Sequence, residues 1–298
     1  DLPTKPPAKD EKAEEKEKVA AAKTPDVVLN ETIGAPYPRR DFPTQLSLVY
    51  VDMPDKGAVL TASMQLAREF INFDQTADSR AALVDLAGVV LDERGKQVAR
   101  FRDRLTISLI SPSDESLRRD LTYNFQTPLK PGLYQVRVAA RDSKSTRSGS
   151  AMQWIEIPDL AERHLSMSSL LLSETKEAEA PKAEAASVIK SAWSVDHHFA
   201  RTSGLRFLTY IYNAARGADG SLSPDVALQV QILRNDQPVL TTTLRKVEPA
   251  GQADLSRLAY AAELPLEAMP PGRYILQVTV IDRVAKASTS QRASFEID

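Results

Sequence analysis

Residues 129–142 read LKPGLYQVRVAARD, and residues 269–282 read MPPGRYILQVTVID. Aligned without a gap, the two stretches are identical at five positions, each pair 140 residues apart. The identical pairs are Pro131 and Pro271, Gly132 and Gly272, Tyr134 and Tyr274, Val138 and Val278, and Asp142 and Asp282. Solenoid repeats recur every 20–50 residues or so, far more closely than this. The spacing predicts two folded domains, each with one copy of the stretch.

The Pro-Gly-x-Tyr segment within each copy predicts a particular turn. Proline fixes φ, and glycine permits a tight bend into the next strand. A tyrosine two residues later can place its ring in the core beneath the bend while its hydroxyl bonds the upstream backbone, as in the tyrosine corner of immunoglobulin-like and fibronectin type III sandwiches. We therefore expect Tyr134 and Tyr274 to be structural. The following strand alternates, with Tyr134, Val136, Val138 and Ala140 inward and Gln135, Arg137, Ala139 and Arg141 outward.

From Phe42 onward, the apolar residues recur mainly at every second position, which is typical of strands with one buried face. Turn residues such as those at 92–95 separate these runs. No segment of helical length in this part carries an apolar stripe. The predicted fold class is all-β, with two tandem immunoglobulin/fibronectin type III-like β-sandwiches and a charged N-terminal segment that is disordered or partly helical.

Composition sets the domain boundaries. Residues 1–38 form a linker rich in Pro, Ala, Lys and Glu, which has too little apolar surface to offset the entropy of ordering. The first sandwich is expected over 39–157, a hinge over 158–161, and the second sandwich over 162–298. Residues 174–187 repeat the linker composition and predict a disordered loop inside the second sandwich.

The overall composition excludes several classes of protein. There are 38 Lys and Arg against 40 Asp and Glu, and no region has the surplus of cations that a nucleic-acid-binding protein needs. Cysteine is absent, which excludes disulfides, thiolate metal sites and cysteine nucleophiles. No run of 18 apolar residues predicts a membrane-spanning helix.

Several longer phrases carry a family resemblance. They are YPRRDFPTQLSLVYVDMPDKGAVLTASMQL (37–66), AGVVLDERGKQV (87–98), LKPGLYQVRVAARD (129–142), GSAMQWIEIPDL (149–160), LSMSSLLLS (165–173) and LPLEAMPPGRYILQVTVID (264–282). Together they resemble the C-terminal region of bacterial, acidobacterial-type von Willebrand factor type A-related proteins. The resemblance implies an exported protein, extracellular or in the cell envelope, with a von Willebrand A domain or another protein as partner. Since the chain begins with Asp1, we expect it to be a piece of a longer protein.

The metal-binding motif of a von Willebrand A domain, Asp-x-Ser-x-Ser, is not present. The segment DSKST at Asp142 has Lys144 in place of the first serine, so no metal ligand can be transferred to this chain. His197 and His198 are adjacent, and adjacent residues of a strand point to opposite faces, which does not suit a metal site. No Gly-x-Ser-x-Gly elbow, phosphate loop or calcium loop occurs. We therefore predict no catalytic residue, no metal and no cofactor.

One strand suggests an interaction surface. Ile155 and Ile157 set the inward phase, which leaves Met152 and Trp154 on the opposite face. Three interpretations stay open for this pair: packing between the domains, contact with an external partner, or ordinary packing within the sandwich. The outward Arg137 and Arg141 form a candidate basic stripe, although nearby acidic residues favour a mixed, solvated face.

These observations predict a non-enzymatic stalk, scaffold or protein-binding region. A structural subunit of a surface layer or filament, assembled through strand edges, is the alternative. A hydrolase with a site between the domains is the weakest hypothesis, because no catalytic motif supports it.

Overall fold

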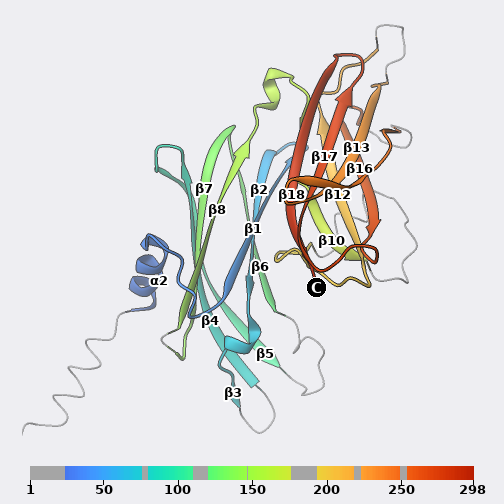
Figure 1. The fold of residues 1–298 in the computed structure, drawn as a ribbon. Helices are drawn as coiled ribbons and strands as arrows, with labels where there is room; N and C mark the ends of the chain where they lie inside the picture. The colour runs from blue at the N-terminus through green and yellow to red at the C-terminus, as the bar shows by residue number, and fades with distance from the viewer. Residues whose placement is uncertain are drawn as a thin grey trace, which may run out of the picture.

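The computed structural model confirms the predicted all-β sandwich fold and contains two sandwiches side by side (Figure 1). The structure describes residues 24–75, 80–109, 120–145, 147–175, 193–217, 223–248 and 254–298. Residues 1–23 of the predicted linker and residues 176–187 of the predicted loop lie outside this part of the chain. Residues 174 and 175 belong to a strand.

The first sandwich pairs a three-stranded sheet with a five-stranded sheet, and all neighbouring strands are antiparallel. The three-stranded sheet consists of β1 (Thr44–Met53), β2 (Gly57–Leu66) and β6 (Leu121–Pro128). The five-stranded sheet consists of β3 (Asp74–Gln75), β4 (Arg80–Asp92), β5 (Gln97–Leu109), β7 (Gly132–Asp142) and β8 (Ser148–Ile157). Their facing sides enclose a core that includes Leu60, Met64, Leu86 and Val138.

The second sandwich pairs a four-stranded sheet with a six-stranded sheet. The four-stranded sheet consists of β9 (Ser166–Met167), β10 (Leu171–Thr175), β12 (Gly204–Tyr212) and β16 (Arg257–Pro265). The six-stranded sheet consists of β11 (His198–Phe199), β13 (Val226–Arg234), β14 (Gln237–Thr241), β15 (Arg245–Lys246), β17 (Gly272–Asp282) and β18 (Ala287–Ile297). Only the short β11–β18 pair is parallel among the described strand pairs. A separate core includes Phe207, Ile232 and Leu276.

The two Pro-Gly-x-Tyr turns have the same geometry. The hydroxyl of Tyr134 donates to the carbonyl oxygen of Lys130 at 2.9 Å, and that of Tyr274 donates to the carbonyl oxygen of Pro270 at 2.6 Å. Both rings are buried. Gly132 and Gly272 have φ values of 148° and 137°, which glycine adopts without the steric cost of a Cβ. Each tyrosine therefore connects the start of its strand to the turn that precedes it.

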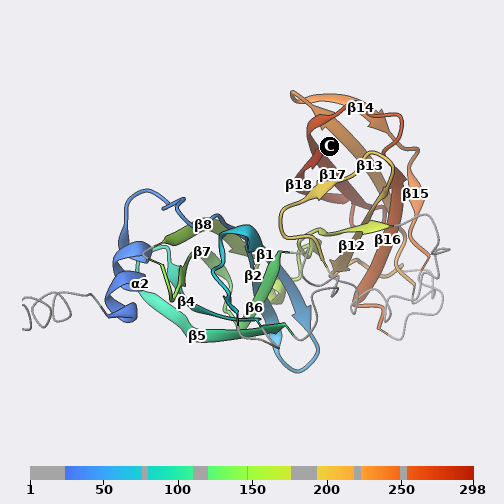
Figure 2. The same ribbon diagram turned by 90° about the horizontal axis from the view of Figure 1, so that it is seen from below.

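Residues 24–34 pack on the first sandwich, so the linker that was predicted to extend to residue 38 does not include them, although their helix fits the partly helical segment that the prediction allowed. Pro25 begins α2 (Pro25–Gly34), and the Thr24 side chain caps it by accepting from the N–H of Val27 at 3.4 Å. Leu29 is 1% exposed and packs on Ala87 and Ala139. The helix covers the outer face of the five-stranded sheet, on the side away from the second sandwich (Figure 2).

The outward side chains of β7 are not all solvated as the alternation predicted. Ala139 is fully buried under α2, and Gln135 is 8% exposed. The inward residues Val136, Val138 and Ala140 are buried as expected. Strand periodicity separates the two faces of a sheet, but it does not show what covers the outer face.

The junction between the sandwiches differs from the simple hinge expected at residues 158–161. Asp159 caps a 3-10 turn, η3 (Leu160–Glu162), by accepting from the N–H of Ala161 at 2.9 Å. The side-chain amide of Asn213, in the second sandwich, donates to the carbonyl oxygens of Leu160 at 2.9 Å and His164 at 3.3 Å. The junction is thus held by the second sandwich rather than left as a free tether.

Candidate functional site

Strand β1 connects the two sandwiches directly. The hydroxyl of Tyr50 donates to the carbonyl oxygen of Met167. Its backbone N–H donates to Oγ of Ser169 at 3.0 Å, and its carbonyl oxygen accepts from the N–H of Ser169 at 3.2 Å. Two residues along, the N–H of Asp52 donates to Oη of Tyr212 at 2.9 Å. Tyr50 is therefore both a core residue of the first sandwich and an anchor for the second.

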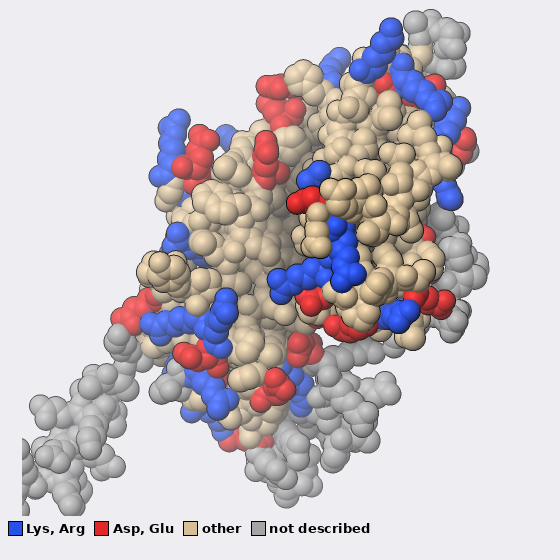
Figure 3. Space-filling view, in the orientation of Figure 1, with Lys and Arg blue, Asp and Glu red and all other residues tan. Residues whose placement is uncertain are grey.

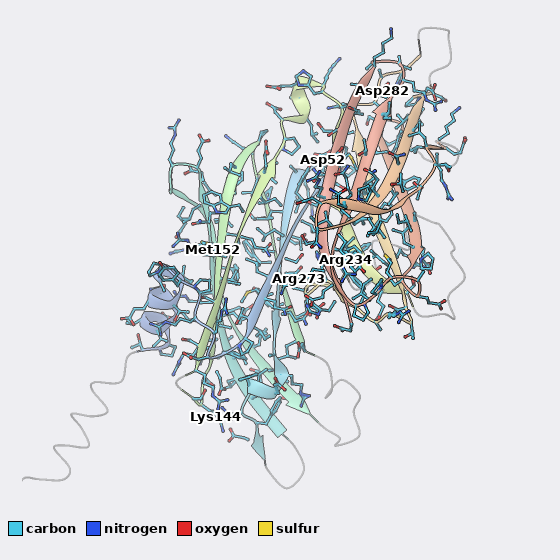
Figure 4. All side chains as sticks on the ribbon, in the orientation of Figure 1. Asp52, Lys144, Met152, Arg234, Arg273 and Asp282 are labelled. Atoms are coloured by element: carbon cyan, nitrogen blue, oxygen red, sulfur yellow. The ribbon has the colours of Figure 1, made fainter. Side chains whose placement is uncertain are left out.

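The protonation of this interface is set by burial. Burial raises the pKa of Tyr50 and of Tyr212 far above the ordinary tyrosine value, so both phenols stay neutral at physiological pH. Burial also raises the pKa of Asp52, an effect that the positive charge of Arg257 reduces. The guanidinium of Arg257 lies 4.1 Å from the centre of the Tyr210 ring, in a cation–π contact. Figure 4 shows Asp52 at the boundary between the two sandwiches.

Beside this interface lies a groove of about 640 Å³, the strand-edge groove, visible as a hollow between the two halves of the molecule (Figure 3). Three strands supply most of its lining: β1 with residues 45–50, β8 with residues 153–156, and β18 with residues 291–294. Ser169, Leu170, Val195, Asp196 and His197 complete it. The groove is therefore built from both sandwiches and depends on their relative position.

His197 fixes one end of the strand-edge groove. Its backbone is in the left-handed region, with φ of 54°, and its ring Nδ1 lies 2.8 Å from the carbonyl oxygen of Ser294. Burial lowers the pKa of His197 below the ordinary value of 6.5. Next to it, burial opposes ionisation of Asp196, but hydrogen bonds from the N–H of His198 and the side chains of Gln65 and Ser194 hold its pKa below the usual range. Gln65 bonds Asp196 across the interface at 3.0 Å.

The predicted interface residues are only partly brought together. On the outer face of the five-stranded sheet, Met152 lies opposite Arg137, and Trp154 lies opposite Gln135. Met152 is 40% exposed and Trp154 is 54% exposed, so neither is buried between the sandwiches. Figure 4 shows Met152 on the first sandwich, away from the second. One of the three interpretations was that Met152 and Trp154 pack between the domains, and the structure does not show this.

Arg141 does not join that group. Arg141 pairs with Ser148 of β8, and its Nη1 is 3.4 Å from the carboxylate of Asp85. Asp85 is 4% exposed and also receives Nε of Arg104 at 2.6 Å, so the two arginines neutralise one buried carboxylate. Arg141 thus belongs to an ion-pair network around a buried carboxylate, whereas Nε of Arg137 donates to the side chain of Gln135 at 2.6 Å.

Sequence reasoning missed Tyr50 and Tyr212 as interface residues. The two-residue period of residues 44–53 puts Leu46, Leu48 and Tyr50 on one face of the strand, and nothing in the pattern of a single strand shows that the hydroxyl of Tyr50 reaches another domain. The sequence did offer one signal for an interface. Both residues are tyrosines near the end of a strand, and a buried tyrosine hydroxyl usually needs a hydrogen-bond partner.

The two adjacent histidines lie in different surroundings. His197 faces the strand-edge groove, while the ring of His198 lies 3.8 Å from Glu296 and 3.6 Å from Asp298. In the part of the chain that the structure describes, no group of three His, Cys, Asp or Glu side chains could hold a metal ion. Asp142 accepts from the side chain of Asn72 and from the N–H of Lys144, and so holds a turn at the strand end. No helix among the described residues is long and apolar enough to cross a bilayer.

Comparison with known proteins gives no family. No family model matches the chain, and no curated protein matches it. Among solved structures, β-glucuronidase from Parabacteroides merdae aligns with 80% of this chain at 11% identity and a TM-score of 0.27. A second structure of that enzyme, with glycerol in its active site, aligns at 12% identity and the same TM-score. The chain spans 28% and 27% of those two chains, and similarity this low supports no inference about activity.

Proposed function

We propose that this chain is a non-enzymatic scaffold, in which two immunoglobulin-like or fibronectin type III-like modules are held in one orientation and present a protein-binding surface. The observation that carries the proposal is the set of hydrogen bonds around Tyr50, which joins β1 to the second sandwich through its side chain and both of its main-chain groups. Two domains that act independently would not need such contacts, since a flexible junction suffices to tether them.

The bonds at the interface support a fixed orientation because they act on several points. Tyr50 contacts Met167 and Ser169, Tyr212 contacts Asp52, and Asn213 holds the junction. Apolar residues of the four-stranded sheet, including Leu208 and Tyr210, also pack against the core of the first sandwich. Apolar burial that is accompanied by satisfied polar groups resists sliding as well as separation.

The resemblance to von Willebrand A-related proteins extends this proposal to a setting. The scaffold would belong to an exported bacterial protein at the cell surface or in the envelope, with a von Willebrand A domain or another protein as its partner. Sequencing of the gene upstream of Asp1 tests this setting. A signal peptide and an Asp-x-Ser-x-Ser segment would support it, and an upstream region without them would contradict it.

The scaffold itself can be tested with spin labels, because the chain has no cysteine of its own. Val98 in β5 and Val239 in β14 are exposed, so cysteines placed at these positions can each carry a label. Double electron–electron resonance should give one narrow distance distribution between the two sandwiches. A broad distribution in the otherwise unmodified chain would contradict a fixed orientation.

A further inference from the structure

The strand-edge groove is lined by strand edges rather than by a sheet face. Successive side chains of a strand point to opposite faces, so a face that lines a pocket contributes every second residue. Here β1, β8 and β18 contribute the consecutive runs 45–50, 153–156 and 291–294. Each strand also lies at or near the border of its sheet. Among the described strands, β1 pairs only with β2, β8 only with β7, and β18 meets β11 only at its last residues. The start of the β8 edge is covered by an isolated bridge between Gly149 and Arg40.

A hydrogen bond near the start of β8 shows which of its residues point their main chain outward. In an antiparallel strand, the N–H and C=O of one residue point to the same side, and the side alternates from residue to residue. The N–H of Ser150 donates outward, to the carbonyl oxygen of Arg39 at 3.0 Å. By alternation, the main-chain groups of Met152, Trp154 and Glu156 point outward as well. No described residue pairs with those groups.

On the opposite wall of the groove, β18 also points main-chain groups away from its own sheet. The N–H of Glu296 donates to the carbonyl oxygen of His197 at 2.9 Å, and the carbonyl oxygen of Ser294 meets the His197 ring. The main chain of Arg292, two residues earlier, therefore points toward the groove, and no described residue bonds it. On β1, Leu48 has the same orientation as Tyr50 and is also without a partner in the described part of the chain. On three sides of the groove, therefore, main-chain donors and acceptors of β1, β8 and β18 have no partner among the described residues, whereas the carbonyl oxygen of Leu46 accepts from the side chain of Gln153.

These edges lack the features that usually prevent strand addition. Natural edge strands are protected by charged side chains, especially lysine, and by proline, bulges or short length. Beyond Ser150, whose N–H is already bonded to Arg39, β8 has no Lys, no Pro and no register shift, and Glu156 is its one charged residue. This part of the strand carries the exposed Met152 and Trp154. A strand added to β8 would place its alternate side chains beside these two, in the cross-strand position that favours aromatic and β-branched pairs.

We propose that the strand-edge groove binds an extended segment of a partner protein, which adds as a strand to the free edge of β8. Main-chain hydrogen bonds to Met152, Trp154 and Glu156 supply affinity, and apolar β-branched or aromatic side chains at every second position pack beside Met152 and Trp154. The inference rests on the proposed protein-binding scaffold, because the groove exists only while the two sandwiches keep their orientation.

The test starts from a phage-displayed library of random nine-residue peptides, selected against the whole chain. The strongest selected peptide is then titrated calorimetrically into the unmodified protein and three variants. Trp154→Pro removes one outward N–H but no bond to β7, and proline is tolerated at such edge positions. Trp154→Ala keeps the N–H and removes the ring. Met152→Lys leaves the backbone intact and charges the edge, so it replaces Trp154→Pro if that variant fails to fold.

We expect Trp154→Pro or Met152→Lys to weaken binding by about tenfold or more, and Trp154→Ala to weaken it less than Trp154→Pro. Hydrogen exchange should show peptide-dependent protection of the amides of Met152, Trp154 and Glu156. Selection of no peptide, unchanged affinity in these variants, or protection on another strand would overturn the proposal. Self-association through β8 in light scattering, abolished by Met152→Lys, would overturn it in favour of a second copy as the occupant. If any of these results came with a narrow spin-label distance distribution, the peptide-binding proposal would fail while the scaffold proposal held. A broad distribution would contradict the scaffold itself, so the two failures are distinguishable.

Discussion

The backbone N–H of Asp52 donates a hydrogen bond to the phenol oxygen of Tyr212 at 2.9 Å, although the two residues are 160 positions apart and belong to different sandwiches. Burial keeps this phenol neutral. The bond satisfies an N–H at the edge of β1 that would otherwise point into the space between the domains. The end of β1 is thus completed by the second sandwich.

The first prediction concerns this interface. Tyr50→Phe and Tyr212→Phe should each lower the free energy of unfolding by about 1 kcal/mol, because each removes one hydrogen bond and leaves a partner group unsatisfied. Both changes should also broaden the spin-label distance distribution between the sandwiches. Urea denaturation measures the first effect. The control is Tyr37→Phe, at a residue that is 81% exposed, and equal losses in all three variants would refute the interface role.

The two tyrosine turns give a second prediction. Tyr134→Phe and Tyr274→Phe should each cost about 1 kcal/mol of stability, since each removes a bond to the turn carbonyl and leaves the ring packing intact. The losses should add, because the two turns lie in separate cores. Thermal and urea unfolding of the single and double variants measure this. A double variant that loses no more than either single one would show that the turns are not independent.

The third prediction tests the role of α2. A chain that begins at Arg39 should be less stable than one that begins at Thr24, because the shorter chain exposes Ala87 and Ala139. Leu29→Ala in the full chain should cost about 2–3 kcal/mol, as expected for loss of a buried leucine. The denaturant midpoints of these proteins measure the differences in stability. If the chain that begins at Arg39 were as stable as the chain that contains α2, the helix would not stabilise the first sandwich.

A fourth prediction follows from a close approach of backbone segments. A Cβ at Gly149 would lie 1.6 Å from the carbonyl oxygen of Phe42, so Gly149→Ala must push apart β8 and the segment before β1. We expect a loss of about 1–3 kcal/mol or more. Gly34→Ala is the matched control, since nothing lies within 4 Å of a Cβ there. Equal stability of the two variants, measured by thermal unfolding, would contradict the close approach.

The fifth prediction concerns pH. Burial lowers the pKa of His197 in the folded protein below 6.5, so just below that pH the unfolded chain binds a proton that the folded chain does not. Stability should therefore fall as the pH decreases through about 6.5, over the window down to the folded pKa. His197→Asn, which tolerates the left-handed backbone, should remove this part of the pH dependence.

The measurement for His197 is urea denaturation at several pH values between neutral and mildly acidic. Asp196 and His198 flank the ring, and both stay in place in the His197→Asn variant. The control is His164→Gln, since the side chain of His164 is 79% exposed. A His197→Asn protein with the same pH dependence as the original would show that another group titrates.

Local sequence determined the strands and their inward faces. Tyr134, Val136 and Val138 are buried as their alternation predicted, because the two-residue period of a strand is a property of the backbone itself. The Pro-Gly-x-Tyr turns were also predictable, since φ restriction by proline and freedom at glycine act within four residues. The start of α2 has a local signal too, a threonine cap followed by proline.

Tertiary structure alone decided the interface and the groove. Tyr50 reads as an ordinary inward residue, and only the fold brings Met167, 117 positions later, within reach of its hydroxyl. Likewise Trp154 reads as an outward residue, and only the arrangement of β1, β8 and β18 leaves its main chain facing a groove. The physical reason is that periodicity records which side of a strand is apolar, whereas the partner of each side depends on contacts between segments far apart in the chain.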